Sequence, residues 1–204
     1  MRLLGLTGNI ACGKSEVARR LERLGAVVID ADLLVRELYS DPTVARGIAE
    51  LFGQDALDAA GIVDRAALGR RVFGDGAALR RLEAFVHPLV AGLRERKLAE
   101  LRRLPVPPSV VVIDAVKLVE SGQARGCAAV WCLVCSESDQ LERLETHRGL
   151  RRDEALSRLA HQPAVEGKRE LLNGIPLRLI RNEGTLEALQ AEVDRAWADF
   201  ISAA

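Results

Sequence analysis

Residues 8 to 15 read GNIACGKS and follow the apolar run LLGLT. The segment fits the pattern G-x-x-x-x-G-K-[ST], with Gly8, Gly13, Lys14 and Ser15 at the defined positions. Glycines at this spacing let successive backbone N–H groups turn inward around phosphate oxygens, and the start of a following helix adds partial positive charge. Because an apolar strand precedes the segment and the amphipathic stretch SEVARRLERL follows it, we predict a phosphate-binding loop rather than a flexible turn.

The chemistry expected of this loop is nucleotide binding. Lys14 would contact the β- and γ-phosphates, and the Ser15 hydroxyl would ligate Mg²⁺. The predicted nucleotide-binding residues of this region are Gly8, Asn9, Ile10, Ala11, Cys12, Gly13, Lys14, Ser15 and Glu16.

Carboxylates end the next two strand-like runs. AVVIDAD ends in Asp30 and Asp32, which we expect on one face of an extended segment because they are two residues apart. At the carboxyl edge of an open α/β sheet, such a carboxylate can accept the proton of an acceptor hydroxyl during phosphoryl transfer. SVVVID ends in Asp114, where a carboxylate would hold Mg²⁺. The alternatives are helix capping for Asp30 and Asp32 and strand termination for Asp114.

The elements that must position these residues alternate along the chain. Apolar segments at 2–7, 26–30, 109–114, 128–135 and 177–181 are predicted strands, with helical patterns between them. Since most of these segments are continuous runs of Val, Ile and Leu, we expect a parallel α/β sheet covered on both faces. The last helix is predicted to begin after Thr185, its cap. Its predicted core-facing stripe is Leu186, Leu189, Val193, Trp197 and Phe200.

The interval between the second and third predicted strands is longer than a single crossover helix requires. Helix starts are predicted at Asp41-Pro42 and Asp64, and a break is predicted at His87-Pro88. We therefore predict a helical insertion at about 33–104 within one domain, returning to the sheet through PVPPS.

Composition places the chain among globular proteins and excludes several classes of partner. Of the 204 residues, 49% are hydrophobic, and the 29 Lys and Arg balance the 29 Asp and Glu. That balance gives no overall field to attract nucleic acid or an anionic membrane. The longest apolar block, CAAVWCLVC, is too short to span a bilayer, and the start of the chain leaves no room for a signal peptide. We expect a cytoplasmic protein with a small-molecule substrate and no obligate protein partner.

The four cysteines are Cys12, Cys127, Cys132 and Cys135. Cys132 and Cys135 have the two-residue gap of metal and redox motifs. However, no second pair follows, and His147 and His161 lie outside zinc-finger spacing. We therefore predict buried, unpaired thiols in a reducing compartment.

Taken together, the loop, the IDAD strand end and the helical interval resemble the dephospho-coenzyme A kinase family. The resemblance covers nearly the whole chain: TGNIACGKS, VIDADLLVREL, EAFVHPLV, VVIDAVKLVESG, RLETHRGLRRDEALSRLAHQ and IRNEGTLEAL. It implies transfer of the ATP γ-phosphate to the ribose 3′-hydroxyl of dephospho-coenzyme A, with ATP and Mg²⁺ as cofactors. It also implies a P-loop fold like that of the nucleoside-monophosphate kinases, with a parallel five-stranded core, a helical acceptor-binding insertion and a lid at about 139–165.

Individual roles follow from the same resemblance. It implies that Asp32 is the base facing the 3′-hydroxyl, and that Arg36 and His87 contact the acceptor. Arg152 would close from the lid onto ATP, and Asn182 would lie near the adenine. Guanidinium groups brought in by closure can neutralise charge on the transferring phosphoryl group while closure excludes water.

Three positions depart from the family pattern. Glu16 places a negative charge after Ser15, and Lys117 of the VKL segment places a cation near the expected acceptor pocket. His147 stands where the lid usually carries Arg, with Arg148 adjacent. These departures leave open an altered acceptor affinity or a loss of activity.

Some of these assignments have alternatives. His87 could pack in a turn beside Pro88, and Arg148 and Arg151 could lie on a solvated helix face. The protein could also be a P-loop kinase for another small hydroxyl compound, or a regulatory nucleotide-binding module without turnover. A nucleotide sensor has no need of an acceptor-side base, so Asp32 favours a kinase.

Overall fold

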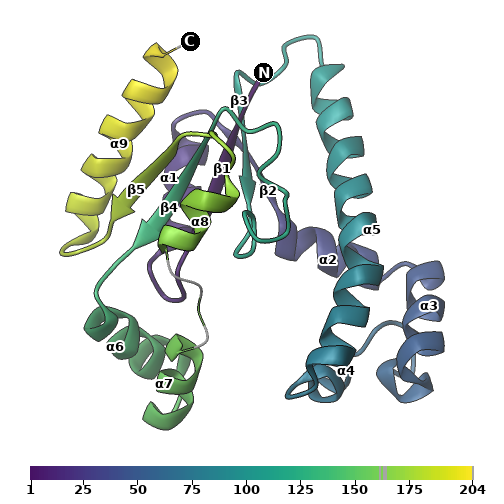
Figure 1. Cartoon of the computed structure of the whole chain (residues 1–204). Helices are drawn as coiled ribbons and strands as arrows, with labels where there is room; N and C mark the ends of the chain where they lie inside the picture. The colour runs from purple at the N-terminus through teal and green to yellow at the C-terminus, as the bar shows by residue number, and fades with distance from the viewer. Residues whose placement is uncertain (161, 163–164, 204) are drawn as a thin grey trace. The chain divides into compact units, whose positions relative to one another are not determined.

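The computed structural model describes residues 1–160, 162 and 165–203 (Figure 1). The chain forms two compact units, Met1–Ile29 with Pro105–Ala204, and Asp30–Leu104. The first unit carries the sheet and the second is helical. The second unit covers nearly the same residues as the predicted insertion, and its acceptor-binding role stays a prediction.

The sheet has five strands in the order β2-β3-β1-β4-β5. β1 pairs in parallel with β3 and with β4, and β4 pairs in parallel with β5. The parallel five-stranded sheet flanked by helices is therefore confirmed. The strands are β1 (Arg2–Gly8), β2 (Val27–Asp30), β3 (Val110–Asp114), β4 (Ala129–Val134) and β5 (Leu177–Arg181).

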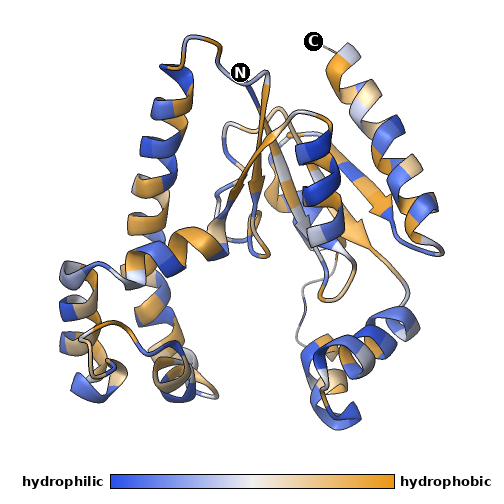
Figure 2. Cartoon of the chain, turned by 180° about the vertical axis from the view of Figure 1, so that it is seen from behind, coloured by the Kyte–Doolittle hydropathy of each residue, from blue (hydrophilic) through white to orange (hydrophobic). Residues whose placement is uncertain are grey.

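One face of the sheet is covered by α1 (Lys14–Arg23) and α9 (Leu186–Ser202), which share a single apolar core with the strands. The strands are coloured mainly as hydrophobic in Figure 2. Thr185 Oγ1 accepts a hydrogen bond from the Ala188 amide at 3.3 Å, which confirms the predicted cap. The prediction that Leu186 faces the core is wrong, because Leu186 is exposed in the first turn of α9. The other four stripe residues pack in this core: Leu189, Val193, Trp197 and Phe200.

Three further helices belong to this unit: α6 (Glu137–Arg148), α7 (Arg152–Ala160) and α8 (Val165–Leu171). α6 and α7 pack on each other through a small separate core of Leu144, Ala155 and Leu159, with Ile10 and Ala11 of the phosphate loop against it. α8 lies on the other side of the sheet from α1 (Figure 1). The predicted lid corresponds to α6 and α7, while His161 and positions 163 and 164 lie outside the described residues.

The helical unit begins each of its main helices with an aspartate that accepts hydrogen bonds from two amides of the first turn. These caps are Asp30, Asp41, Asp64 and Asp75, and the helix starts predicted at Asp41-Pro42 and Asp64 are confirmed. The elements are α2 (Ala31–Tyr39), α3 (Pro42–Phe52), the 3₁₀ turn η1 (Gln54–Ala56), α4 (Arg65–Val72) and α5 (Gly76–Arg102).

The predicted break at His87-Pro88 is wrong, because α5 continues through Pro88. An interior proline costs a helix about 3 kcal/mol. Here the buried side chains Val86 and Val90 lie on both sides of the proline, and α5 packs on α2 and α4. That burial offsets the lost hydrogen bond. His87 is therefore a half-buried helix residue and not a turn residue.

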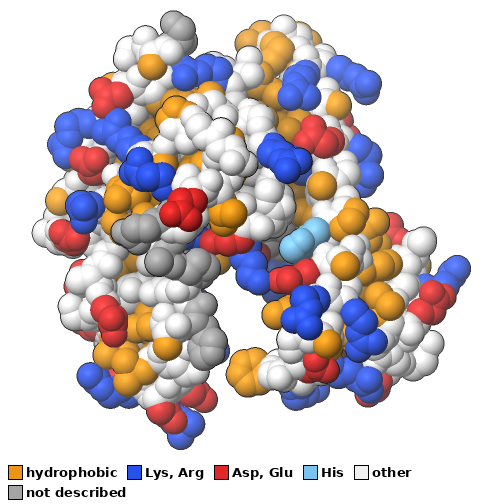
Figure 3. Space-filling view, viewed as in Figure 1, with side chains coloured by type: hydrophobic (Ala, Val, Ile, Leu, Met, Phe, Trp, Pro, Cys, Tyr) orange, Lys and Arg blue, Asp and Glu red, His pale blue; other side chains and the backbone are white. Residues whose placement is uncertain are grey.

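Charged side chains are distributed without a dominant sign. Acidic and basic groups are mixed over the face seen in Figure 3, in keeping with the balance of the sequence. Within the described residues, no helix combines the length and apolar character needed to cross a bilayer.

Candidate nucleotide site

The phosphate loop connects β1 to α1. Its start is tied to the neighbouring strand, since the Asn9 amide donates to the Leu133 carbonyl at 3.1 Å. Two of its residues have left-handed backbones, Ala11 with φ 58° and Gly13 with φ 90°. Lys14 then begins α1, where the Glu16 amide donates to the Gly13 carbonyl at 3.0 Å and the amides of Lys14 and Ser15 precede the first intrahelical acceptor. Those amides and the positive end of the helix form a site for an anion.

Lys14 and Asp114 form an ion pair at the loop. Asp114 is the last residue of β3, in register with Leu6 of β1, so its carboxylate lies near the end of the strand that enters the loop. Asp114 is only 4% exposed. A buried carboxylate requires a compensating charge, which Lys14 supplies. Asp114 ends its strand, as the structural alternative predicted, and also pairs with the lysine of the phosphate loop, while its role toward Mg²⁺ stays a prediction.

Asn182 holds the backbone of the loop through a hydrogen bond. The residue follows β5 and is 8% exposed. Its backbone amide donates to the Val134 carbonyl at 2.9 Å, and its Nδ2 donates to the Cys12 carbonyl at 3.0 Å. This amide thus holds the loop backbone, and its proximity to an adenine stays a prediction from the resemblance.

Gly13→Ala tests the shape of the loop. Its left-handed backbone disfavours any Cβ, at about 1–2 kcal/mol, and the new Cβ would lie 2.6 Å from Asn182 Nδ2. Gly25→Ala is the matched control, since Gly25 has φ 94° but nothing within 4 Å of a Cβ. Both variants should lose stability from the strained backbone, and Gly13→Ala should lose more because of the contact with Asn182. Only Gly13→Ala is expected to weaken ATP binding, by about tenfold or more. Calorimetry measures ATP affinity and thermal unfolding measures stability. Equal ATP affinities in the two variants would contradict the assignment of this loop as the nucleotide site.

Two glutamines that the sequence analysis missed also hold the loop. Gln140 Nε2 donates to the Ile10 carbonyl at 2.7 Å, and the Ile10 amide donates to Gln162 Oε1 at 3.2 Å. The two side chains also bond to each other, Gln162 Nε2 donating to Gln140 Oε1 at 3.1 Å. Gln140 is 3% exposed. The only sequence signal for a buried Gln140 is its position one helical turn before Leu144, on the buried side of α6.

Four arginines, Arg143, Arg148, Arg151 and Arg152, lie close together in the sequence of the predicted lid, and within the described residues only one of them contacts the loop. Arg143 Nη1 donates to the Ala11 carbonyl at 3.3 Å. Arg152 is exposed and forms an ion pair with Glu145 at 3.5 Å, within α6 and α7. Arg151 is exposed and lies 3.1 Å from Asp153, so it is solvated as the alternative predicted, although it precedes α7 and is not on a helix face. The structure therefore brings Arg143, and not Arg152, to the loop.

The expectation that Asp30 and Asp32 share one face of an extended segment is wrong. β2 ends at Asp30 and α2 begins at Ala31. Asp30 accepts hydrogen bonds from the amides of Asp32 at 2.7 Å and Leu33 at 3.4 Å, because its carboxylate caps the helix. The capping alternative thus applies to Asp30, whereas Asp32 is an exposed residue of the first turn.

The acceptor residues implied by the resemblance belong to the helical unit. Arg36 is exposed in the last turn of α2, and His87 is half-buried in α5. Asp32 and Arg36 are four residues apart, so one face of α2 presents both side chains. The departure at Glu16 is compensated locally, because Glu16 pairs with Arg19.

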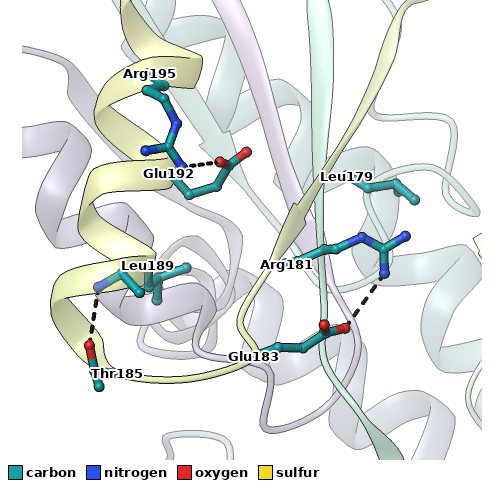
Figure 4. Close-up of a pocket in the computed structure, with 8 residues that line it drawn as sticks. Leu179, Arg181, Glu183, Thr185, Leu189, Glu192 and Arg195 are labelled. Carbon is teal, nitrogen blue, oxygen red and sulfur yellow. Dashed lines mark hydrogen bonds and ion pairs between the residues drawn. The ribbon is translucent and has the colours of Figure 1, made fainter.

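A pocket of about 300 Å³ lies between β5 and α9, beside the segment that carries Asn182 (Figure 4). Two arginines line it, and each has an acidic partner in the same wall. Arg181 lies 3.5 Å from Glu183, and Arg195 lies 2.8 Å from Glu192. Since these charges are paired, we assign the phosphates to the loop and not to this pocket.

All four cysteines are free thiols. Cys12, Cys127 and Cys132 are buried as predicted, whereas Cys135 is only half-buried. The prediction of thiols without a disulfide is confirmed, but it did not include the contact between two of them, since the Sγ atoms of Cys12 and Cys135 lie 2.8 Å apart. The cause is the parallel pairing of β1 with β4, which brings together the segments that follow both strands.

Comparison with known proteins places this arrangement in a family. A family model described as dephospho-CoA kinase matches residues 2–187. A dephospho-CoA kinase of Geobacter sulfurreducens is 44% identical over 199 residues, covering 97% of this chain and 98% of the relative. The crystal structure of a Thermus thermophilus protein has a TM-score of 0.76 at 31% identity, with coverage of 98% and 96%. The fold is shared with a dephospho-CoA kinase from Campylobacter jejuni, at a TM-score of 0.66, 21% identity and 98% coverage of both chains. With its phosphate loop, five-stranded parallel sheet and match over nearly its whole length, the chain belongs to the dephospho-CoA kinase family.

Proposed function

We propose that this protein transfers the γ-phosphoryl group of ATP to the ribose 3′-hydroxyl of dephospho-coenzyme A, giving coenzyme A. The observation that carries the proposal is the family match over residues 2–187, which includes both the phosphate loop and the helical unit. A match of that extent favours dephospho-coenzyme A over another hydroxyl acceptor. It also favours turnover over nucleotide sensing.

The loop and Lys14 would hold the nucleotide. Its backbone amides and the start of α1 bind phosphate oxygens, and the Lys14 ammonium adds a full positive charge at the β- and γ-phosphates. Asp114 and Asn182 act as positioning residues. Asp114 holds the Lys14 ammonium beside the loop, and Asn182 holds the Cys12 carbonyl.

Asp32 would accept the proton of the acceptor hydroxyl. Its carboxylate is exposed, and the capping of α2 is performed by Asp30. Arg36, on the same face of α2, and His87 would contact the acceptor. Arg152 would leave its partner Glu145 and neutralise charge on the transferring phosphoryl group. Breaking this exposed ion pair costs little, since such a pair contributes about 0–1 kcal/mol.

The residues at the loop also fit Mg²⁺. This ion takes oxygen ligands and is usually held by one or two protein groups together with substrate phosphates. The exposed Ser15 hydroxyl in the first turn of α1 and the Asp114 carboxylate are donors of that kind. When bound, Mg²⁺ would neutralise part of the phosphate charge.

We also propose that the enzyme works in the cytoplasm on small-molecule substrates. Its four free cysteines suit a reducing compartment. Its balanced charge gives no general attraction for nucleic acid.

The test of the proposed function is ADP release with ATP, Mg²⁺ and a panel of hydroxyl acceptors. We expect turnover with dephospho-coenzyme A and little with compounds that lack its nucleotide or its free 3′-hydroxyl. Turnover that requires a different acceptor would contradict the proposed substrate. ATP binding without turnover on any acceptor would contradict the kinase assignment.

Closure of α6 and α7 over bound substrates is expected to slow hydrogen exchange in the predicted lid, about 139–165. This region packs on the loop at Ile10 and Ala11, so phosphates in the loop can bias its position. The measurement is hydrogen exchange with and without a non-hydrolysable ATP analogue plus dephospho-coenzyme A. α9, which packs in the sheet core, serves as the internal reference. Equal exchange in α6 and α7 with and without both ligands would refute closure.

A further inference from the structure

Two thiols from distant parts of the chain meet at the phosphate loop. Cys12 lies within the loop and is 1% exposed, while Cys135 directly follows β4 and is half-buried. Their Sγ atoms share a hydrogen bond of 2.8 Å. We call these two residues the thiol pair. They were not joined by the sequence pattern, which pointed to Cys132 and Cys135.

Cys132 is chemically different from the thiol pair. It is fully buried within β4, and its Sγ donates a long hydrogen bond of 3.9 Å to the Leu133 carbonyl. Burial raises the pKa of Cys132 to about 11. Because the thiolate is the reactive form of cysteine, Cys132 is inert near neutral pH.

Cys135 is the reactive member of the thiol pair. The hydrogen bond with Cys12 holds the pKa of Cys135 below its ordinary value, and the nearby Arg143 guanidinium acts in the same direction. Burial and the carboxylates of Asp139 and Glu183 oppose this shift. The same hydrogen bond, together with burial, raises the pKa of Cys12. On ionisation, Cys135 therefore takes the negative charge and Cys12 keeps its proton.

We propose that the thiol pair is a modification site for low-molecular-weight disulfides, at which a Cys12–Cys135 disulfide forms and weakens nucleotide binding. The Cys135 thiolate attacks one sulfur of a small disulfide RSSR, forms a mixed disulfide and releases RS⁻. Cys12 then loses its proton to solvent, and its thiolate attacks the Cys135 sulfur and releases the second RS⁻. The two protein thiols are oxidised to one disulfide, and the small disulfide is reduced to two thiols.

Formation of the Cys12–Cys135 disulfide requires little movement of the sulfurs, but it shifts the backbone of the phosphate loop. A disulfide brings its sulfurs to about 2.05 Å, an approach of about 0.8 Å from the observed 2.8 Å. Cys12 stands between the left-handed residues Ala11 and Gly13, and its carbonyl is held by Asn182. Since the amides around it must converge on one phosphate, a shift of this size is expected to weaken ATP binding about tenfold or more.

The test compares reduced and oxidised forms of the whole chain. The protein is incubated with 2-hydroxyethyl disulfide, freed of reagent, and examined by peptide mapping and by calorimetry with a non-hydrolysable ATP analogue. We expect a cross-linked Cys12–Cys135 peptide and about tenfold or weaker binding, both reversed by dithiothreitol. The reduced protein is the reference. If it binds the analogue but both thiols stay free after treatment, the modification site is overturned while the proposed function is untouched.

Variants identify the sulfurs involved. Cys135→Ser should bind the analogue as the reduced wild type does and should be insensitive to the reagent. Cys132→Ala, three residues earlier and within β4, should keep full sensitivity. A loss of affinity that persists in Cys135→Ser, or a wild-type Cys12–Cys135 disulfide that leaves affinity unchanged, would overturn the proposal. Peptide mapping of the wild type does not depend on the folding of any variant.

Discussion

Lys14→Ala is expected to lower kcat/KM for ATP by about 10³-fold or more, with weaker ATP binding as well. The variant removes a positive charge from the β- and γ-phosphates, where negative charge is redistributed in the transition state. Steady-state kinetics at varied ATP, together with calorimetry, measure both effects. A variant that keeps its rate within tenfold of the wild type would show that Lys14 does not contact the reacting phosphates.

The ion pair with Asp114 complicates this variant and also supplies its control. Removing Lys14 breaks its buried ion pair with Asp114, and breaking a buried pair costs about 3–5 kcal/mol. Adding Asp114→Asn removes the carboxylate charge that Lys14 balances in the wild type. We expect the double variant Lys14→Ala/Asp114→Asn to recover much of the thermal stability without recovering ATP binding. Recovery of both would mean that the first loss came from folding alone.

Asp32→Asn is expected to lower kcat by about 10² to 10⁴ while the dissociation constant for ATP hardly changes. The amide keeps the size of the side chain but cannot accept the proton of the acceptor hydroxyl. Kinetics with dephospho-coenzyme A and separate calorimetry with ATP distinguish the two quantities. An Asp32→Asn enzyme that retains most of its kcat would exclude Asp32 as the base.

Asp30→Asn is the matched control, because the structure gives Asp30 a different task two residues away. Its carboxylate caps α2, and asparagine caps a helix about as well as aspartate. We therefore expect near wild-type activity and a small change in melting temperature. If Asp30→Asn lost as much kcat as Asp32→Asn, the loss would reflect a disturbed start of α2 and not a missing base.

Local patterns in the sequence were sufficient for the strands, the phosphate loop and most helix starts. The Val and Ile of VVVID form a continuous apolar run because helices cover both faces of a parallel sheet, and the short length and β-branched residues of the run identify it as a strand. The caps at Asp41, Asp64 and Thr185 were predictable for a similar reason. Each acts on amides only two or three residues away, so the interaction is contained in the local sequence.

Two predictions from local sequence failed because a second interaction at the same residues outweighed the local preference. Pro88 favours a break, but burial on both sides of it keeps α5 continuous. The spacing of Asp30 and Asp32 favours one face of a strand, but the Asp30 carboxylate starts a helix between them. Packing decided the first case and a capping hydrogen bond decided the second. The sequence does not show whether either interaction is stronger than the local preference that it opposes.

Only the tertiary structure decided which side chains hold the phosphate loop. Asn182, Gln140 and Gln162 reach the loop backbone from more than a hundred positions away, and Asp114 reaches Lys14 from the end of another strand. The contact of Cys12 with Cys135 has the same origin. The sequence by itself determined that a phosphate loop lies between a strand and a helix. Its partners were decided by the strand order β3-β1-β4-β5, because parallel pairing brings together at one edge of the sheet residues that the chain keeps far apart.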